Sequence, residues 1–230
     1  MKNNSPIFVT GVERSGSSLV TRVLEIAGAY VGPTTVMKEN LNIKKVVDDY
    51  YDKQGLCPFG QYPLPNVDEL SIPNNWRTKV EAGLMSEGVD VENQKWMYKT
   101  NRLCQTWPVW NHAFPNAKWI IVRRRTGDIV ESCLKTGFMR AFKGLDARRK
   151  INVETEEDGW KWWVRWNEKR FVEIIEAGLN CKIIWPERMI QGDYSQMYET
   201  LEWVGLPWKD EIINKIDPVL WKSRKKYAEI

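Results

Sequence analysis

Residues 6–18 read PIFVTGVERSGSS, and they join a short apolar run to a loop with two glycines and then to a helical pattern. Pro6 to Thr10 has the length and composition of a buried strand. From Ser18 to Ala27 the apolar residues fall on one stripe, which predicts a helix. The loop has the GxxxxG spacing of a Walker A motif, but Ser17 stands where the lysine of that motif follows. Because such a loop presents backbone N–H groups and a positive helix end, a phosphate is the expected ligand.

The first loop carries its cation early, at Arg14, and hydroxyl groups follow at Ser15, Ser17 and Ser18. A nucleoside triphosphatase needs the missing lysine to reach its β- and γ-phosphates. The loop therefore favours a phosphate-bearing ligand that is bound through Arg14 and the serine hydroxyls instead of a Walker A lysine. A helix N-cap in a ligand-free glycine turn is the alternative explanation of the same residues.

A second strand, loop and helix follow later in the chain. The apolar run Trp119 to Val122 leads into RRRTGD, and a helical pattern runs from about Asp128 to Lys135. Arg124 at the strand end and Ser132 in the helix are placed to converge on one dianion. Two anion sites at neighbouring strand ends suit a ligand with two separate anionic groups. A solvated arginine turn and an incidental serine are the alternative.

The remaining pattern predicts the fold class. Asp158 to Ala177 predicts a long helix, and CKIIW at residues 181–185 predicts a third buried strand. Strands that alternate with helices predict an α/β fold with a central parallel sheet flanked by helices. A chain of 230 residues fits a single domain, residues 1–230. Residues 55–75, rich in Pro, Gly, Asn and Asp, predict an irregular surface excursion.

The composition excludes several classes of protein. The formal net charge of +4 is too small to argue for nucleic acid as a partner. The chain has neither the roughly 20 apolar residues of a membrane span nor the apolar core of a signal peptide, so we expect a cytoplasmic protein with no membrane span. The cysteines have no CxxC spacing, so we expect reduced thiols and no metal site; they are Cys57, Cys104, Cys133 and Cys181.

Taken together, the two loops resemble those of the sulfotransferases that use 3′-phosphoadenosine 5′-phosphosulfate (PAPS). PIFVTGVERSGSSLVTRVLEIAG resembles the 5′-phosphosulfate-binding loop of this family, and FPNAKWIIVRRRTGDIVES resembles its 3′-phosphate-binding strand, loop and helix. The resemblance implies a P-loop-type three-layer fold, PAPS as co-substrate and no metal requirement. The residues that it implies for the donor are Arg14, Ser15, Gly16, Ser17 and Ser18 at the 5′-phosphosulfate and Arg124 and Ser132 at the 3′-phosphate.

The same resemblance implies catalytic residues. MYKTNRL, residues 97–103, looks like the lysine-containing strand end of the family, which places Lys99 beside the transferring sulfuryl group. Arg14 stands where the cytosolic members carry lysine, so the loop is similar to the arginine-bearing branch, which includes the tyrosylprotein and carbohydrate sulfotransferases. In that branch the general base is a glutamate after the first helix, and Glu39 lies at a similar distance here. Lys99 and Arg14 are then expected to stabilise charge.

Other candidates for the base are Asp48 and Asp49. We disfavour His112, the only histidine, because single histidines near helix ends are more often capping or packing residues. The basic C-terminal residues Lys222, Arg224 and Lys225 lack the glycine-rich context of the cytosolic members, so no role at the nucleotide is expected from them.

The acceptor is expected to lie against an irregular segment of about residues 33–96, where the resemblance is thinnest. A carbohydrate, a small molecule and a peptide tyrosine are all compatible, and Trp76 or Trp107 could line the pocket. Two other functions stay open: a P-loop nucleotide kinase or phosphotransferase, which needs magnesium, and a non-catalytic nucleotide-binding module. The oligomeric state is not predicted.

Overall fold

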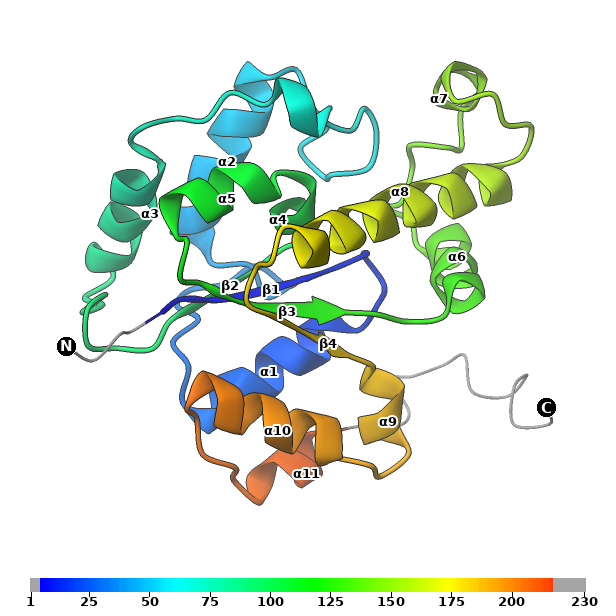
Figure 1. Cartoon of the computed structure of the whole chain (residues 1–230). Coiled ribbons are helices and arrows are strands. Elements are labelled where there is room, and N and C mark those ends of the chain that lie inside the picture. Colours follow the sequence, from blue (N-terminus) through cyan, green and yellow to red (C-terminus); the bar gives the residue numbers. More distant parts are fainter. Residues whose placement is uncertain (1–4, 217–230) are drawn as a thin grey trace.

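A parallel sheet forms the centre of the protein (Figure 1). The computed structural model describes residues 5–216, so Lys222, Arg224 and Lys225 lie outside the described residues. Within that range the sheet has the strand order β2-β1-β3-β4. Its strands are β1 (Ile7–Gly11), β2 (Met97–Lys99), β3 (Lys118–Val122) and β4 (Cys181–Ile184).

Helices cover both faces of the sheet (Figure 1). One face carries α1 (Ser17–Ala27), α9 (Pro186–Ile190), α10 (Ser195–Val204) and α11 (Glu211–Lys215). The other carries α2 (Leu41–Lys53), α3 (Trp76–Met85), α4 (Arg102–Gln105), α5 (Trp107–Ala113), α6 (Thr126–Lys135) and α8 (Glu156–Glu176), with α7 (Leu145–Lys150) at its margin. The predicted three-layer α/β arrangement is therefore confirmed.

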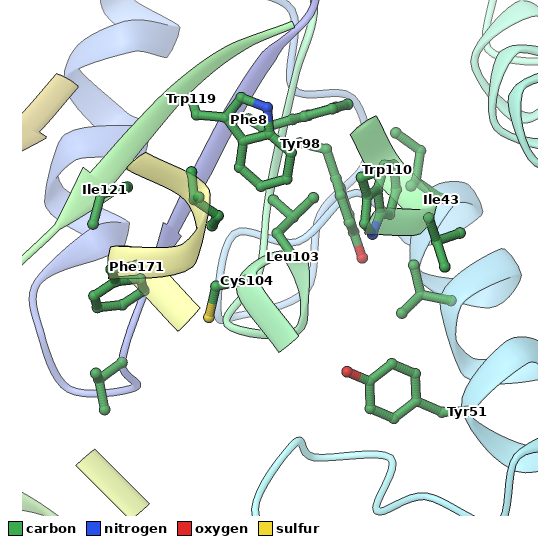
Figure 2. Close-up of a cluster of buried hydrophobic side chains, with 14 of the residues drawn as sticks. Phe8, Ile43, Tyr51, Tyr98, Leu103, Cys104, Trp110, Trp119, Ile121 and Phe171 are labelled. Carbon is green, nitrogen blue, oxygen red and sulfur yellow. The ribbon is translucent and has the colours of Figure 1, made fainter. Parts of the chain in front are cut away.

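Alternation along the strands divides the buried side chains into two cores. Phe8 and Trp119 face the layer of α5 and α8, whereas Ile7 and Ile120 face the layer of α1. Figure 2 shows the first core, where the Phe8 ring packs edge-on against Trp110 at 5.1 Å and Trp119 at 5.2 Å between ring centroids. Large aromatic rings supply much of this layer, because each removes a large apolar area from water.

The segment of residues 33–96 is less irregular than expected, because it contains α2 and α3. In α2 the buried residues Ile43, Val47 and Tyr50 recur at helical spacing. Trp76 begins α3 and is 3% exposed in the core, so the expectation that it lines an acceptor pocket is wrong. Residues 55–75 are irregular as predicted, apart from the short 3₁₀ turn Val67–Glu69.

Parallel pairing brings the carboxyl ends of the strands to one edge of the sheet. Val9 of β1 is in register with Lys99 of β2, and Gly11 is in register with Val122 of β3. The first loop, Lys99 and the arginines after Val122 therefore start from the same edge, where ligands of open α/β sheets bind.

Candidate active site

The first loop has the backbone shape of an anion site. Arg14 and Gly16 have φ angles of 71° and 93°, both left-handed, and such a conformation costs a non-glycine residue about 1–3 kcal/mol. Gly16 is the N-cap of α1, where no described side chain caps the helix and no acidic residue lies in the first turn. The positive end of α1 is thus open to an anion. A Cβ on Gly11 would lie 2.6 Å from the Val122 carbonyl oxygen, so only glycine allows this approach of β1 to β3.

Ser15 holds a buried polar atom in the middle of this loop. The residue is 0% exposed, and its Oγ has no hydrogen-bond partner within residues 5–216. Buried polar atoms are normally satisfied, so an unpartnered hydroxyl in an anion-type loop fits a loop built for a ligand.

Hydrogen bonds join the first loop to the second. The Arg14 Nε donates to Ser132 Oγ at 2.9 Å. The Arg124 Nη1 donates to the Arg14 carbonyl oxygen, also at 2.9 Å. The Arg124 side chain is only 9% exposed, and its Nε lies 3.7 Å from Oδ2 of Asp128 in the first turn of α6. The two loops that the sequence singles out are therefore packed together.

A cavity of about 570 Å³ lies over these loops, and we name it the basic cavity. Its lining residues are Glu13, Arg14, Gly16, Ser17, Ser18, Leu19, Arg22, Val36, Met37, Lys38, Lys99, Arg124, Ile190, Asn214 and Lys215. It brings together Arg14, Gly16, Ser17, Ser18, Lys99 and Arg124 of the expected site. Ser15 is buried and Ser132 is partly buried, and neither lines this cavity.

A second cavity, of about 410 Å³, adjoins the first, and we name it the apolar cavity. Its lining residues are Gly11, Glu13, Ser17, Thr35, Val36, Met37, Glu39, Lys44, Pro58, Phe59, Lys99, Asn101, Arg102 and Phe138. The two cavities share Glu13, Ser17, Val36, Met37 and Lys99, which mark their junction.

Lys99 ends β2 at that junction and is 7% exposed. Its Nζ donates to the Met37 carbonyl oxygen at 2.9 Å, and the Ser18 Oγ donates to the same oxygen at 3.4 Å. Burial lowers the pKa of Lys99 from its ordinary value, while the negative charges of Glu39 and Glu13 oppose this effect.

Glu39 lies in a turn that leads into α2. Thr34 and Asn40 form an antiparallel bridge, and the Asn40 side chain caps α2 by accepting from the Ile43 N–H at 2.9 Å. The Glu39 Oε2 lies 3.7 Å from Nη2 of Arg102, which is 2% exposed. Glu39 therefore lies in the apolar cavity beside a fixed cation.

The other candidates for the base line neither cavity. Asp48 forms ion pairs with Arg102 (Nη1 to Oδ1, 2.6 Å) and with Lys44 (Nζ to Oδ2, 2.5 Å). It is not among the residues that line either cavity. Asp49 on α2 and His112 on α5 are exposed and likewise line neither.

Glu13 is a site residue that sequence reasoning missed. It lines both cavities, and its Oε2 is buried without a hydrogen-bond partner among the described residues. Burial raises the pKa of Glu13 to about 7; the charge of Glu39 adds to this effect, while Lys99, Arg102 and Arg14 oppose it. A carboxylate directly before the cation of an anion-binding loop was the available signal.

A larger cavity, of about 920 Å³, lies elsewhere, between the loop around residues 62–68 and α8. It contains none of the expected site residues. Trp107 lines this larger cavity and not the apolar one.

Among residues 5–216, no helix combines the length and apolar character needed to cross a membrane. Nor does any group of three or more His, Cys, Asp or Glu side chains lie close enough to hold a metal ion.

Comparison with known proteins identifies a family and several solved structures with a similar fold. The model of the family described as "Sulfotransferase family" matches residues 6–210. No curated protein matches the sequence. Sulfotransferase STF1 from Mycobacterium tuberculosis H37Rv is similar in structure, with 15% sequence identity, a TM-score of 0.54 and coverage of 92% of this chain and 70% of that chain. Sulfotransferase STF9 from Mycobacterium avium has 13% identity, a TM-score of 0.58 and coverage of 93% of this chain and 67% of that chain. The sulfotransferase domain from the curacin biosynthetic pathway has 12% identity, a TM-score of 0.58 and coverage of 95% of this chain and 80% of that chain. At these identities the structures show a shared fold.

Proposed function

The chain belongs to the sulfotransferase family, and on that premise we propose that it transfers the sulfuryl group of PAPS to a hydroxyl group of an acceptor. The observation that carries the proposal is the junction of the basic and apolar cavities at Lys99. One side offers cations and a helix N-terminus to a doubly anionic donor. The other side offers apolar walls to an acceptor.

In this proposal the donor lies in the basic cavity. Arg14 and the loop through Ser18 hold the 5′-phosphosulfate, Arg124 holds the 3′-phosphate, and Ser15 and Ser132 support these loops. Ser132 acts through Arg14, to whose Nε its Oγ is bonded at 2.9 Å. PAPS supplies an activated sulfuryl group whose leaving group is the phosphate of 3′,5′-adenosine bisphosphate, and we expect no metal to be required.

The residues at the junction then divide the chemistry. Glu39 accepts the proton of the acceptor hydroxyl, whose oxygen forms the new bond to sulfur. Lys99 and Arg14 stabilise the negative charge on the sulfuryl oxygens and on the oxygen that leaves with the phosphate. Because Lys99 is buried, its charge acts in a medium that screens it less than water does.

The shape of the apolar cavity favours a small acceptor with a hydrophobic body. Val36, Met37, Pro58, Phe59 and Phe138 supply its apolar walls, while charged side chains gather at the junction. A phenol or a hydrophobic alcohol would bury its body against those walls and direct its hydroxyl at Glu39 and Lys99. A peptide tyrosine presents the same group.

A screen of hydroxyl compounds with ³⁵S-labelled PAPS tests the proposed function. We expect label transfer to phenols and hydrophobic alcohols in the presence of EDTA. A matched set of polar sugars tests the preference for an apolar body. Failure of every class to accept label, although the bisphosphate binds, would leave a non-catalytic nucleotide-binding module as the function.

Replacing Glu39 with Gln should lower turnover by about 10²- to 10⁴-fold, the usual contribution of a positioned acid or base. Donor affinity should stay unchanged, because Glu39 lines only the apolar cavity. Steady-state kinetics and bisphosphate titration measure the two quantities. Glu92→Gln, in an exposed loop, is the matched control. Turnover of the Glu39 variant equal to that of this control would remove Glu39 as the base.

We also propose a cytoplasmic location, with a small molecule as the acceptor. The four cysteines are unpaired, as a reducing compartment permits.

A further inference from the structure

Glu13 has no role in the reaction described so far, although it lies at the centre of the site. It precedes Arg14 in the first loop and lines both cavities at their junction. A carboxylate in a loop that holds anions should repel them, so its presence there calls for a specific function.

The surroundings of Glu13 define what it can do. The charged groups that act on it come from three directions: Lys99 at the end of β2, Glu39 in the turn before α2 and Arg102 at the start of α4, with Arg14 beside it in its own loop. Its Oε2 is buried and has no partner among the described residues. This oxygen is thus able to accept a proton without first breaking a hydrogen bond.

Glu13 and Glu39 differ in the partner that each has. The Nη2 of Arg102 lies 3.7 Å from Oε2 of Glu39 and forms an ion pair with it. Burial raises the pKa of Glu13 to about 7, and the charge of Glu39 contributes to this effect. Near neutral pH, Glu13 is therefore a group expected to gain and lose a proton.

We propose that Glu13 is a further catalytic residue, which acts with Glu39 as a carboxyl pair that takes up the proton of the acceptor hydroxyl. The inference rests on the proposed function. In the step, the O–H bond of the acceptor breaks and its proton passes to the pair. The acceptor oxygen bonds to sulfur, and the electrons of the breaking S–O bond leave with the 5′-phosphate. Release of the product returns the proton to water.

The direction of the pH dependence follows from this role. The pair must be free of the proton to receive one, so kcat/KM should rise with pH through an apparent pKa near 7. Glu13→Gln should abolish this rise of kcat/KM with pH. Glu39→Gln should move it to lower pH, because it removes a negative charge that raises the pKa of Glu13.

The acceptor offers a second test of the same role. A weakly acidic hydroxyl such as that of 2-naphthol needs a base, whereas 4-nitrophenol ionises appreciably at neutral pH and needs one less. Glu13→Gln should lower turnover of 2-naphthol by at least tenfold more than turnover of 4-nitrophenol. The exposed Glu202→Gln of α10 should change neither.

Carbon-13 NMR of protein labelled at the glutamate side-chain carboxyl groups gives a measurement that needs no turnover. One resonance should titrate near pH 7, vanish in Glu13→Gln and move to lower pH in Glu39→Gln. Titration of every glutamate near its ordinary value, about 4.3, would overturn the inference. Transfer by Glu13→Gln with an unchanged pH profile would also overturn it, while leaving the proposed function intact. Absence of transfer by the unsubstituted protein, by contrast, would overturn the proposed function itself.

Discussion

Replacing Lys99 with Met should reduce turnover by about 10²- to 10³-fold, the loss that follows removal of one donor to a developing negative charge. Methionine has an apolar chain of similar length to the lysine stem and lacks the ammonium group. The effect should fall on kcat more than on donor affinity, because the charge at the junction of the two cavities grows as the sulfuryl group is transferred. Initial rates at saturating donor measure it.

The thermal stability of Lys99→Met shows whether a loss of turnover comes from unfolding. Lys99 is buried, and its main polar contact is the Met37 carbonyl oxygen at 2.9 Å. Removing an ammonium group from a buried position also removes its desolvation cost, so the variant should remain folded in thermal unfolding. Lys53→Met, at the exposed end of α2, is the matched control. A folded Lys99 variant with the turnover of this control would exclude Lys99 from charge stabilisation.

Replacing Arg124 with Ala should weaken binding of 3′,5′-adenosine bisphosphate by about 1.5–3 kcal/mol, the typical worth of a charged hydrogen bond. This corresponds to a rise of roughly 10- to 150-fold in the dissociation constant. Arg124 lines the basic cavity, and its contact with the Arg14 carbonyl oxygen orients it toward the first loop. Isothermal titration calorimetry measures the change.

The neighbouring arginine is the control for this prediction. Arg125→Ala removes an exposed guanidinium one residue away, and it should leave the affinity within about twofold, because surface charges contribute little. Equal losses in both variants would indicate general electrostatic attraction. An unchanged affinity in Arg124→Ala would contradict its assignment to the 3′-phosphate.

The two loops and the layers of the fold could be predicted because short-range patterns encode them. The apolar runs that became β1 and β3 each end in a loop before a helix, and parallel pairing then places those loops together. Such short-range patterns did not predict α3. Pro73, Asn74 and Asn75 suggested an extended loop through Trp76, whereas Asn75 is the N-cap of that helix.

The candidate site was predictable where one motif supplies its residues and less so where separate segments meet. The hydrogen bond from Arg14 to Ser132 joins residues that are 118 positions apart in the sequence. Glu13 escaped prediction because its role depends on Lys99, Glu39 and Arg102, which reach it from other elements. Burial and the sum of neighbouring charges set its pKa, and neither is visible in a short stretch of sequence.

Calorimetric titration of the protein with 3′,5′-adenosine bisphosphate in EDTA tests the central claim most directly. If two joined loops hold the two ends of one nucleotide, the bisphosphate should bind without a divalent cation. Adenosine 5′-monophosphate and adenosine 3′-monophosphate should each bind at least tenfold more weakly. Binding of ATP with magnesium, and none of the bisphosphate, would contradict the account and indicate a nucleotide kinase or phosphotransferase instead.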